Sequence, residues 1–276
     1  MNCIADLIRS SRQLVTVSDT PQLDVELLLC KALDKSRTWL KTWPEKELSE
    51  GQKAYFQQLF NRRLAGEPIA YIIGTQGFWN LELEVSPETL IPRPETEILV
   101  EATLALDLPD DTHILDLGTG TGAIALALAS ENLIWQVTAV DQSAQAVELA
   151  ERNRQNCGVH NVQVFESDWY TAVEGQQFDV IVSNPPYIDI NDTHLLQGDV
   201  RFEPSSALVA GADGLDDLRV IIAGAGKYLV QCGWLLVEHG YQQGKAVQQL
   251  FEQAGFHQIE TRYDLNGLER VTRGCL

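Results

Sequence analysis

The segment Phe178-Asp-Val-Ile-Val-Ser-Asn-Pro-Pro-Tyr187 joins an apolar strand to a proline-rich end. Its first six residues are mostly apolar and are typical of a strand buried in a sheet. The two prolines must stop this strand, because each fixes φ at about −65° and has no N–H group. The backbone therefore leaves the sheet in one defined direction just after Asn184.

This strand end carries groups that suit a planar –NH2. Asn184 offers an amide oxygen, the carbonyl of Pro185 has no ladder partner, and Tyr187 offers a flat aromatic face. A planar –NH2 is a poor nucleophile because its lone pair is delocalised, but two accepting oxygens can turn that lone pair toward an electrophile. A strand that merely ends in prolines is the simpler interpretation. The whole tetrapeptide, including Pro186, favours an amide or amino pocket.

Composition predicts a globular protein with one large domain or two small ones. The 276 residues are 45% hydrophobic, which is enough for a packed core. No apolar run approaches the roughly 18 residues of a membrane span, and the start lacks the features of a signal peptide. We therefore expect a cytoplasmic protein with no membrane partner. The five cysteines have no Cys-x-x-Cys spacing and predict neither a disulfide framework nor a metal site.

The net charge of −19 comes from residues 81–276, since residues 1–80 carry a net charge of +1. Residues 1–80 contain ten Lys/Arg and nine Asp/Glu, whereas residues 81–276 contain ten and thirty. Nucleic-acid binding draws much of its affinity from basic side chains on phosphates. The acidic part therefore argues against a nucleic-acid partner and in favour of a protein or small-molecule partner.

The first 65 residues show apolar side chains at helical spacing. Ser18-Asp-Thr-Pro21 and Ser49 provide signals for helix starts, and Gly66 provides a stop. The pattern predicts a small helical bundle domain over residues 1–67.

Two apolar segments follow, Ile69–Ile73 and Phe78–Val85, on either side of a break at 74–77. The second half of the later segment alternates like a half-buried strand. We expect a β-hairpin linker over residues 68–90. A helix from Ile98 to Leu106 comes next.

From Thr112 onward strands and helices alternate, which predicts a mostly parallel sheet covered on both faces within a domain 91–276. The expected strands are 114–117, 136–140, 162–165, 178–183, 233–238, 259–263 and 269–273. The expected helices are 123–129, 215–230 and 244–254.

The first strand of this region enters a glycine-rich loop that leads into a helix. Glycines let the backbone approach a ligand closely, and the N-terminus of the helix lies next to it. The second strand ends in Asp141, roughly twenty residues on, where a carboxylate can take both ribose hydroxyls. A nucleoside cofactor is therefore expected on Asp141 and on the loop residues Gly118, Thr119, Gly120, Thr121 and Gly122.

The loop alone does not identify the cofactor. The pattern Gly118-x-Gly120-x-x-Ala123 also satisfies the dinucleotide fingerprint of NAD. Asp116 lies directly before the loop, where it can attract a cationic amino-acid group rather than a pyrophosphate. Together with the amide pocket downstream, this favours S-adenosylmethionine over NAD or over a loop that binds nothing.

The third strand ends in Glu166-Ser-Asp-Trp169. Asp168 can hydrogen-bond the exocyclic amine of adenine, and Trp169 can cover the ring, although both can also be ordinary strand-end residues. Ligands of open α/β sheets bind over the carboxyl ends of the strands. Asn184 would then meet the cofactor as well as the amide.

With these motifs the chain resembles the class I S-adenosylmethionine-dependent methyltransferases and, more closely, the release factor glutamine methyltransferases of the PrmC (HemK) family. The widely shared motifs are 114–122, Asp141, 167–169 and 183–188. The motifs that are more specific to this family are Gly66-Glu-Pro-Ile-Ala-Tyr71, Gly77-Phe-Trp79, Leu90-Ile-Pro-Arg-Pro-Glu-Thr-Glu97 and Asp199-Val-Arg-Phe-Glu-Pro204.

The resemblance implies a Rossmann-like sheet whose last strand is antiparallel, joined by the hairpin to the helical domain. It also implies that the substrate is the glutamine of the Gly-Gly-Gln loop in class 1 peptide chain release factors. That glutamine would be methylated on its amide nitrogen, and the helical domain would help to dock the release factor. By the same resemblance Asn184 and Pro185 hold the amide and Tyr187 packs on it. Arg93 and Glu97 join the substrate-binding set, although their motif can also serve folding.

The expected reaction is a direct in-line transfer by a monomeric enzyme, with no metal and no covalent intermediate. His239 is the nearest candidate base, and a core or capping histidine is the alternative. Three other functions stay open: an amino-methyltransferase for a nucleic-acid base, which would have to be flipped out; a glutamine methyltransferase for a ribosomal protein; and a cofactor-binding module without catalysis.

Overall fold

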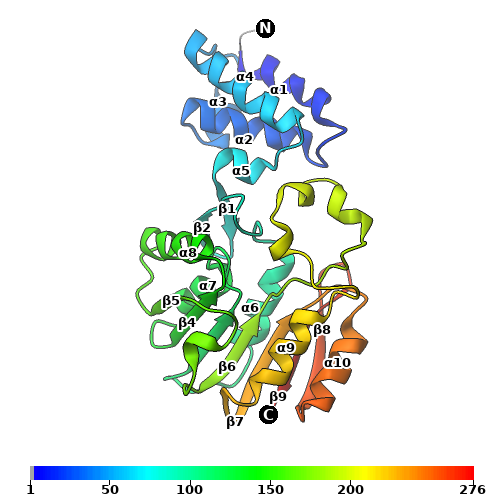
Figure 1. Cartoon of the computed structure of the whole chain (residues 1–276). Coiled ribbons are helices and arrows are strands. Elements are labelled where there is room, and N and C mark those ends of the chain that lie inside the picture. The colour runs from blue at the N-terminus through cyan, green and yellow to red at the C-terminus, as the bar shows by residue number, and fades with distance from the viewer. Residues whose placement is uncertain (1–2) are drawn as a thin grey trace. The chain divides into compact units, whose positions relative to one another are not determined.

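The computed structural model describes residues 3–276, so that Met1 and Asn2 of the predicted domain 1–67 lie outside the described residues. The chain forms two compact units, shown together in Figure 1. The helical unit contains the residues up to Thr75 together with Thr193–Phe202. The sheet unit contains Gln76–Asp192 and Glu203–Leu276.

The helical unit confirms the helices predicted for the first 65 residues. Its elements are α1 (Ile4–Ile8), the 3-10 helix η1 (Arg9–Leu14), α2 (Pro21–Leu33), α3 (Arg37–Thr42), α4 (Glu50–Leu64) and α5 (Ile69–Ile73). Ser49 caps α4 in a reciprocal capping box with Gln52, which satisfies two N–H groups of the first turn. The buried side chains of these helices form one apolar core, which includes Leu28, Leu29, Phe56 and Phe60.

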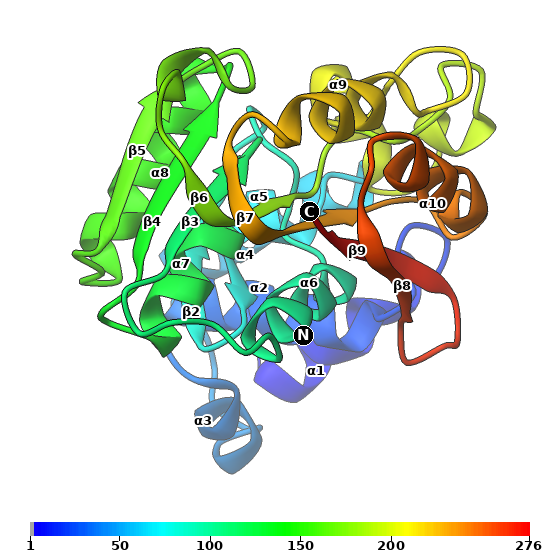
Figure 2. The ribbon, with the colours of Figure 1, turned by 90° about the horizontal axis from the view of Figure 1, so that it is seen from below.

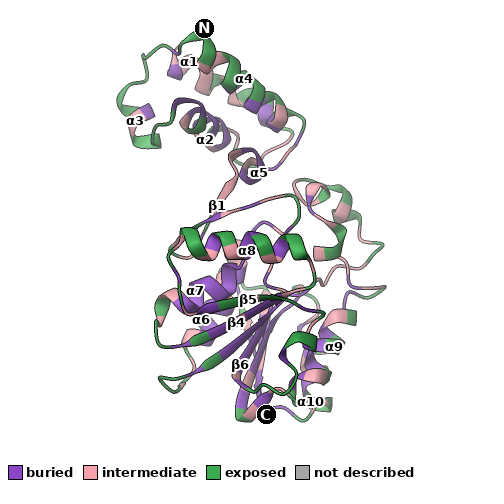
Figure 3. Ribbon diagram, turned by 60° about the vertical axis from the view of Figure 1, so that its left-hand side comes forward, coloured by how far each residue is buried: buried purple, intermediate pink, exposed green. Residues whose placement is uncertain are grey.

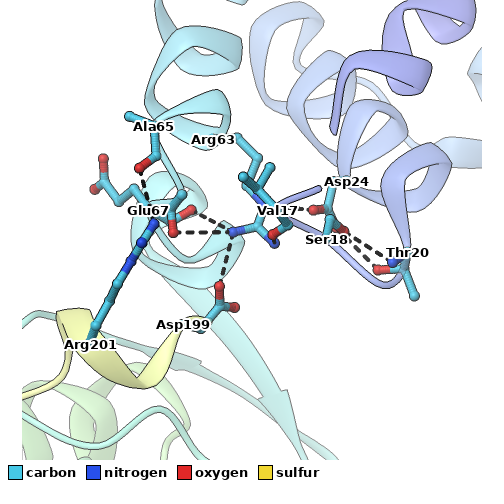
Figure 4. A network of polar contacts seen from close by, with 10 residues as sticks. Val17, Ser18, Thr20, Asp24, Arg63, Ala65, Glu67, Asp199 and Arg201 are labelled. Carbon is cyan, nitrogen blue, oxygen red and sulfur yellow. Dashed lines mark hydrogen bonds and ion pairs between the residues drawn. The ribbon is translucent and has the colours of Figure 1, made fainter. Parts of the chain in front are cut away.

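A buried arginine on α4 joins several segments of the helical unit (Figure 4). Arg63 donates from Nε to Asp24 Oδ2 at 2.7 Å and from Nη2 to the carbonyl of Val17 at 2.9 Å. Its Nη1 donates to the carbonyl of Glu67 at 2.9 Å and to Asp199 Oδ1 at 3.0 Å. The charge of this guanidinium is thus matched by acceptors on several sides.

The segment Thr193–Phe202 belongs to the helical unit although it follows the strand of the predicted amide pocket. It contains the 3-10 helices η4 (Thr193–Leu196) and η5 (Val200–Phe202). Beside the Asp199 contact, Arg201 Nη2 donates to the carbonyl of Ala65 at 3.3 Å. Two side chains of the motif that starts at Asp199 therefore serve the packing of this unit.

The linking hairpin is present, but its first predicted strand is wrong. Residues 69–73 form helix α5, which Gly74 ends in the left-handed conformation with φ 85°. The hairpin consists of β1 (Thr75–Phe78) and β2 (Leu81–Glu84). A five-residue apolar run is ambiguous between helix and strand, and here three of its residues are buried, as a short core helix requires.

The turn of the hairpin lies inside the segment predicted as one strand. Trp79 has φ 57°, a conformation that is uncommon for residues other than glycine. Its backbone N–H donates to Glu97 Oε1 at 2.8 Å, and its indole N–H donates to Glu131 Oε1 at 2.6 Å. Contacts to distant residues therefore hold this turn.

The sheet unit contains a seven-stranded sheet in the order β5-β4-β3-β6-β7-β9-β8. The strands are β3 (His113–Leu117), β4 (Gln136–Asp141), β5 (Val162–Glu166), β6 (Phe178–Ser183), β7 (Leu229–Glu238), β8 (His257–Tyr263) and β9 (Glu269–Cys275). Neighbours pair in parallel from β5 to β7, whereas β9 is antiparallel to β7 and to β8. This confirms the predicted sheet with its antiparallel last strand.

Helices cover both faces of this sheet (Figure 2). They are α6 (Glu97–Leu104), α7 (Ala123–Glu131), α8 (Ala144–Asn156), α9 (Asp216–Ala225) and α10 (Gly244–Gln253). Short 3-10 helices are η2 (Pro94–Thr96), η3 (Thr171–Val173) and η6 (Ser205–Ala207). The central strand β6 alternates between two cores, with Val180 and Val182 against α6 and α7 and Ile181 against α9 and α10.

Burial explains why these strands read as continuous apolar runs. Central strands and helix α7 are buried along their length in Figure 3. A strand covered on both faces needs apolar side chains at successive positions.

Within residues 3–276, no helix is long and apolar enough to cross a membrane.

Candidate active site

A cavity of about 490 Å³ lies at the carboxyl ends of β3, β4, β5 and β6 in the sheet unit. This is the edge at which open α/β sheets bind ligands. Most of the predicted site residues line it: Gly118, Thr119, Gly120, Thr121, Asp141, Asp168, Trp169, Asn184 and Pro186. Residues from the ends of four strands, β3, β4, β5 and β6, are thus brought into one cavity.

The glycine-rich loop needs backbone conformations that favour glycine. Gly118, Gly120 and Gly122 have φ values of 73°, 56° and 84°. At Gly118 a Cβ atom would lie 3.5 Å from the ring of Trp169, which is ordinary van der Waals contact, so the positive φ is what favours glycine there.

Asp141 ties this loop to the end of β4. Its Oδ2 accepts from the N–H of Gly120 at 2.9 Å, and its Oδ1 accepts from the N–H of Ser143 at 2.9 Å. Burial raises the pKa of Asp141, and these backbone donors oppose the rise. The side chain that was predicted to bind ribose also shapes the loop.

Asp116 is a buried carboxyl with one unused oxygen. Its Oδ2 accepts from Thr119 Oγ1 at 2.6 Å, whereas its Oδ1 has no hydrogen-bond partner among the described residues. Burial raises the pKa of Asp116 to about 7; the Thr119 hydroxyl and the backbone N–H of Ala125 lower it, and the charge of Asp141 adds to the rise. Asp116 does not line the cavity itself, but Thr119 does. A cation bound nearby would favour the ionised form.

The segment after β5 supplies Asp168 and Trp169 to the cavity. Trp169 has φ 45°, and the hydroxyl of Ser167 donates to its carbonyl at 2.8 Å. The exposed carboxylate of Asp168 lies at the rim. An aromatic face next to Gly118 and an acceptor beside it suit the predicted adenine contacts.

Asn184 has the orientation that the predicted amide pocket requires. Its Nδ2 donates to Thr96 Oγ1 at 3.1 Å. Its Oδ1 is buried and has no partner in the part of the chain that the structure describes. A buried polar atom without a partner is costly in a native protein, so this oxygen is available to a bound N–H group.

Tyr187 packs against the core instead of lining the cavity. Its hydroxyl donates to Glu238 Oε1 at 3.2 Å, and its carbonyl accepts from Gln243 Nε2 at 3.0 Å. Burial raises the pKa of this phenol, and the charge of Glu238 adds to the rise. The phenol is therefore neutral and unsuited to act as a base.

Arg93 and Glu97 do not line the cavity either. Arg93 Nη2 pairs with Glu203 Oε2 at 2.6 Å, while Glu203 Oε1 accepts from the N–H of Ile91 at 3.1 Å. Glu97 accepts from Trp79 in the hairpin turn. Both residues that were assigned to the substrate have partners within the sheet unit.

His239 is a core histidine, which was the alternative to a catalytic base. Its Nε2 lies 2.8 Å from Thr272 Oγ1 and its Nδ1 lies 3.0 Å from the carbonyl of Gly240. Burial lowers its pKa, so the ring stays neutral.

The structure adds residues that the sequence did not single out. Thr96 lines the cavity and holds Asn184, and Glu238 holds Tyr187. The motif that contains Thr96 was a signal, but a hydrogen bond between residues 88 positions apart has no local pattern. Further lining residues are Glu88, Thr89, Leu90, Pro92, Ser206 and Ala207.

Comparison with known proteins matches both units. Residues 94–201 match the family model "Methyltransferase small domain", and residues 6–74 match "PrmC N-terminal domain". The chain is 54% identical to the release factor glutamine methyltransferase of Pseudomonas aeruginosa, over 99% of each chain. It is 49% identical to that of Escherichia coli K12, over 97% of this chain and 96% of the relative.

Solved structures show the same fold at much lower identity. A methyltransferase from Pyrococcus furiosus has a TM-score of 0.55 at 17% identity, covering 81% of this chain and 98% of its own. The T. thermophilus 16S rRNA N2 G1207 methyltransferase has a TM-score of 0.52 at 20% identity, covering 73% and 49%. At these identities the likeness concerns the fold alone.

Proposed function

Because the chain belongs to the release factor glutamine methyltransferase family, we propose that it methylates the glutamine of the Gly-Gly-Gln loop in class 1 peptide chain release factors. The methyl donor is S-adenosylmethionine. The acceptor atom is the amide nitrogen of the glutamine side chain. The unpaired Asn184 Oδ1 in the cavity is the observation that carries this choice of acceptor.

The residues around the cavity fit this cofactor. When bound, S-adenosylmethionine supplies an electrophilic methyl group on a sulfonium centre. Asp116, with its unused oxygen, would favour the positive charges of the methionine portion. The loop Gly118–Gly122 and Asp141 would hold the ribose side, and Asp168 and Trp169 would hold adenine.

The amide nitrogen would be held by two oxygens. Asn184 Oδ1 accepts one N–H of the substrate amide, and the carbonyl of Pro185 accepts the other. Both protons then lie toward the enzyme, which turns the nitrogen lone pair away from these oxygens and toward the methyl group. The N–CH3 bond would form as the S–CH3 bond of the donor breaks to leave a neutral thioether, and the nitrogen would then lose one proton to water.

The other assigned residues do not touch the substrate amide but support the residues that hold it. Tyr187 packs beneath the strand end with its hydroxyl on Glu238, so that the backbone at Pro185 and Pro186 keeps its direction. We assign Arg93 and Glu97 to the support of the segments that they contact, which contain Glu203 and the hairpin turn at Trp79.

We assign a part in docking the release factor to the helical unit. A protein partner fits the charge distribution, because residues 81–276 carry thirty acidic and ten basic side chains. This balance argues against nucleic acid as the substrate. We also propose that the protein is a monomer in the cytoplasm, and the mass measured by sedimentation of the purified protein tests whether it is a monomer.

Mass spectrometry of a release factor tests the proposed reaction. An unmethylated class 1 release factor is incubated with the enzyme and S-adenosylmethionine, alongside a release factor in which the loop glutamine is replaced. We expect one added methyl group on the loop glutamine and none on the variant. Calorimetric binding of the cofactor without methylation would contradict the substrate and direct the search to ribosomal proteins and nucleic acids.

A further inference from the structure

We propose that Thr96 is a positioning residue for methyl transfer: its hydroxyl fixes the carboxamide of Asn184 with Oδ1 toward the substrate and Nδ2 away from it. This inference rests on the proposed function, because it assigns Asn184 Oδ1 to the glutamine amide. Thr96 lies in η2, at the start of helix α6, and lines the cavity.

The carboxamide of an asparagine has two orientations that fill the same space. A half-turn exchanges the oxygen, which accepts hydrogen bonds, for the NH2 group, which only donates. In the wrong orientation Asn184 would present its own N–H groups to the N–H groups of the substrate. Only an oxygen in this position can hold the nitrogen of an amide.

Thr96 distinguishes these two orientations if its own proton is directed elsewhere. A hydroxyl has one proton and can also accept. Asn184 Nδ2 donates to Thr96 Oγ1 at 3.1 Å, so the oxygen of Thr96 acts as acceptor toward Asn184. The proton of Thr96 therefore needs another acceptor.

Glu238 is that acceptor. It is 1% exposed, its Oε1 accepts from the Tyr187 hydroxyl at 3.2 Å, and the hydroxyls of Thr96 and Tyr187 both oppose the rise of its pKa. Oε2 is buried and has no hydrogen-bond partner among residues 3–276, so it is open to the hydroxyl proton of Thr96. An ionised carboxylate only accepts, so the direction of donation runs from Asn184 to Thr96 and on to Glu238. Because Asn184 must donate to Thr96, its Nδ2 is held there and its Oδ1 is left for the substrate.

The charge state of Glu238 decides how firmly this direction is fixed. Burial raises its pKa to about 7, and the negative charge of Glu95 adds to the rise. The hydroxyls of Thr96 and Tyr187 and the positive charge of Arg270 oppose it. Above pH 7 the carboxylate is ionised and the orientation of Asn184 is fixed most firmly.

Substitutions at position 96 separate this role from packing. Thr96→Val keeps the shape and removes the hydroxyl, whereas Thr96→Ser keeps the hydroxyl. Thr103→Val is the matched control, because Thr103 is a fully buried threonine of α6 whose hydroxyl only returns to the carbonyl of Leu99 at 2.8 Å. Each variant is assayed at pH 8 for kcat, for KM with the release factor, for cofactor Kd by calorimetry and for melting temperature.

We expect Thr96→Val to lower kcat by at least about tenfold, since half of the Asn184 orientations or more would then face the substrate wrongly and the correct one would lose its support. KM and cofactor Kd should change less than about twofold, and the melting temperature should change by no more than a few degrees. Thr96→Ser should restore most of kcat, and Thr103→Val should match the wild type. Thr96→Ala replaces the valine variant if valine prevents folding.

A double variant shows whether Thr96 acts through Asn184. In an Asn184→Ala background, Thr96→Val should cause no further loss of the residual activity. An equal loss in both backgrounds would overturn the positioning role, as would a Thr96→Val enzyme with wild-type kcat. If the wild type itself leaves the release factor unmethylated, the proposed function fails together with this inference. A wild type that methylates while Thr96→Val matches it overturns the inference alone.

Discussion

The buried polar groups around Arg63 in the helical unit differ from those near the cavity of the sheet unit in whether they find partners. In the helical unit the guanidinium of Arg63 meets Asp24, Asp199 and two backbone carbonyls. In the sheet unit, oxygens of Asp116 and Asn184 are buried without any partner among the described residues. A satisfied buried network serves the fold, whereas an unsatisfied one at a cavity is completed by a ligand.

The pKa values follow the same division. Burial alone would lower the pKa of Arg63, but hydrogen bonds and charges from Asp24 and Asp199 raise it above its ordinary value. Burial raises the pKa of Asp116 and of Glu238 to about 7, because neither carboxyl meets a cation in contact. In the helical unit Arg63 therefore stays charged, whereas near the cavity burial raises the pKa values of two carboxyls.

The largest effect on stability is expected from Arg63→Ala. It leaves Asp24 buried without its cation, which costs about 3–5 kcal/mol of unfolding free energy. Arg62→Ala is the matched control on the same helix, since the pair of Arg62 with Glu67 is partly exposed and contributes about 0–1 kcal/mol. Urea denaturation of both variants measures the difference. Equal losses would contradict the role given to the buried network.

The largest effect on catalysis is expected from Asn184→Ala. Removing a preorganised group at the reacting centre costs about 10²–10³ in turnover. Cofactor affinity should stay close to that of the wild type, because the loop and Asp141 are unchanged. Single-turnover methylation and calorimetry measure the two quantities. A variant that loses cofactor affinity but keeps its turnover with saturating cofactor would show that Asn184 serves the cofactor only.

A smaller effect is expected in the proton balance of cofactor binding. The pKa of Asp116 lies at about 7 in the free protein, above its unfolded value, so at pH 6 the carboxyl is mostly protonated. A cationic ligand favours the carboxylate, and binding at pH 6 therefore releases up to about one proton. The release should fade above pH 8, where Asp116 is already ionised.

Calorimetry at pH 6 in buffers of different ionisation enthalpy measures this release. Asp116→Asn should abolish it, and Asp168→Asn is the control at the exposed rim of the cavity. Proton uptake instead of release would mean that the cofactor binds the protonated form of Asp116.

The sequence predicted the strands and the cavity well because both have local causes. Apolar runs, glycines and the prolines after Ser183 act within a few residues, and a parallel sheet brings the ends of its strands together. The hairpin was misplaced because α5 is a five-residue apolar run and because its turn uses Trp79 at positive φ. Glu97, 18 residues away, holds that turn.

Long-range polar contacts had no such signal. The strand end at Asn184 predicts an amide pocket, but nothing near it indicates Thr96 or the neighbouring Glu238. The segment Thr193–Phe202 likewise belongs to the helical unit through Arg63 and Arg201 contacts that cross more than 130 positions. Such contacts depend on the completed fold.

Urea denaturation of Asp116→Asn and Asp24→Asn at pH 8, each with and without S-adenosylmethionine, tests the division between the two units most directly. Without cofactor, Asp24→Asn should lose about 1–3 kcal/mol of unfolding free energy, because the buried guanidinium loses one of its two carboxylate partners. Asp116→Asn should lose none, because asparagine can still accept from Thr119 and no longer carries a buried charge. With cofactor, Asp24→Asn should gain as much stability as the wild type, and Asp116→Asn should gain clearly less. If Asp116→Asn is destabilised as much as Asp24→Asn and is still fully stabilised by the cofactor, then Asp116 serves the fold and the account is contradicted.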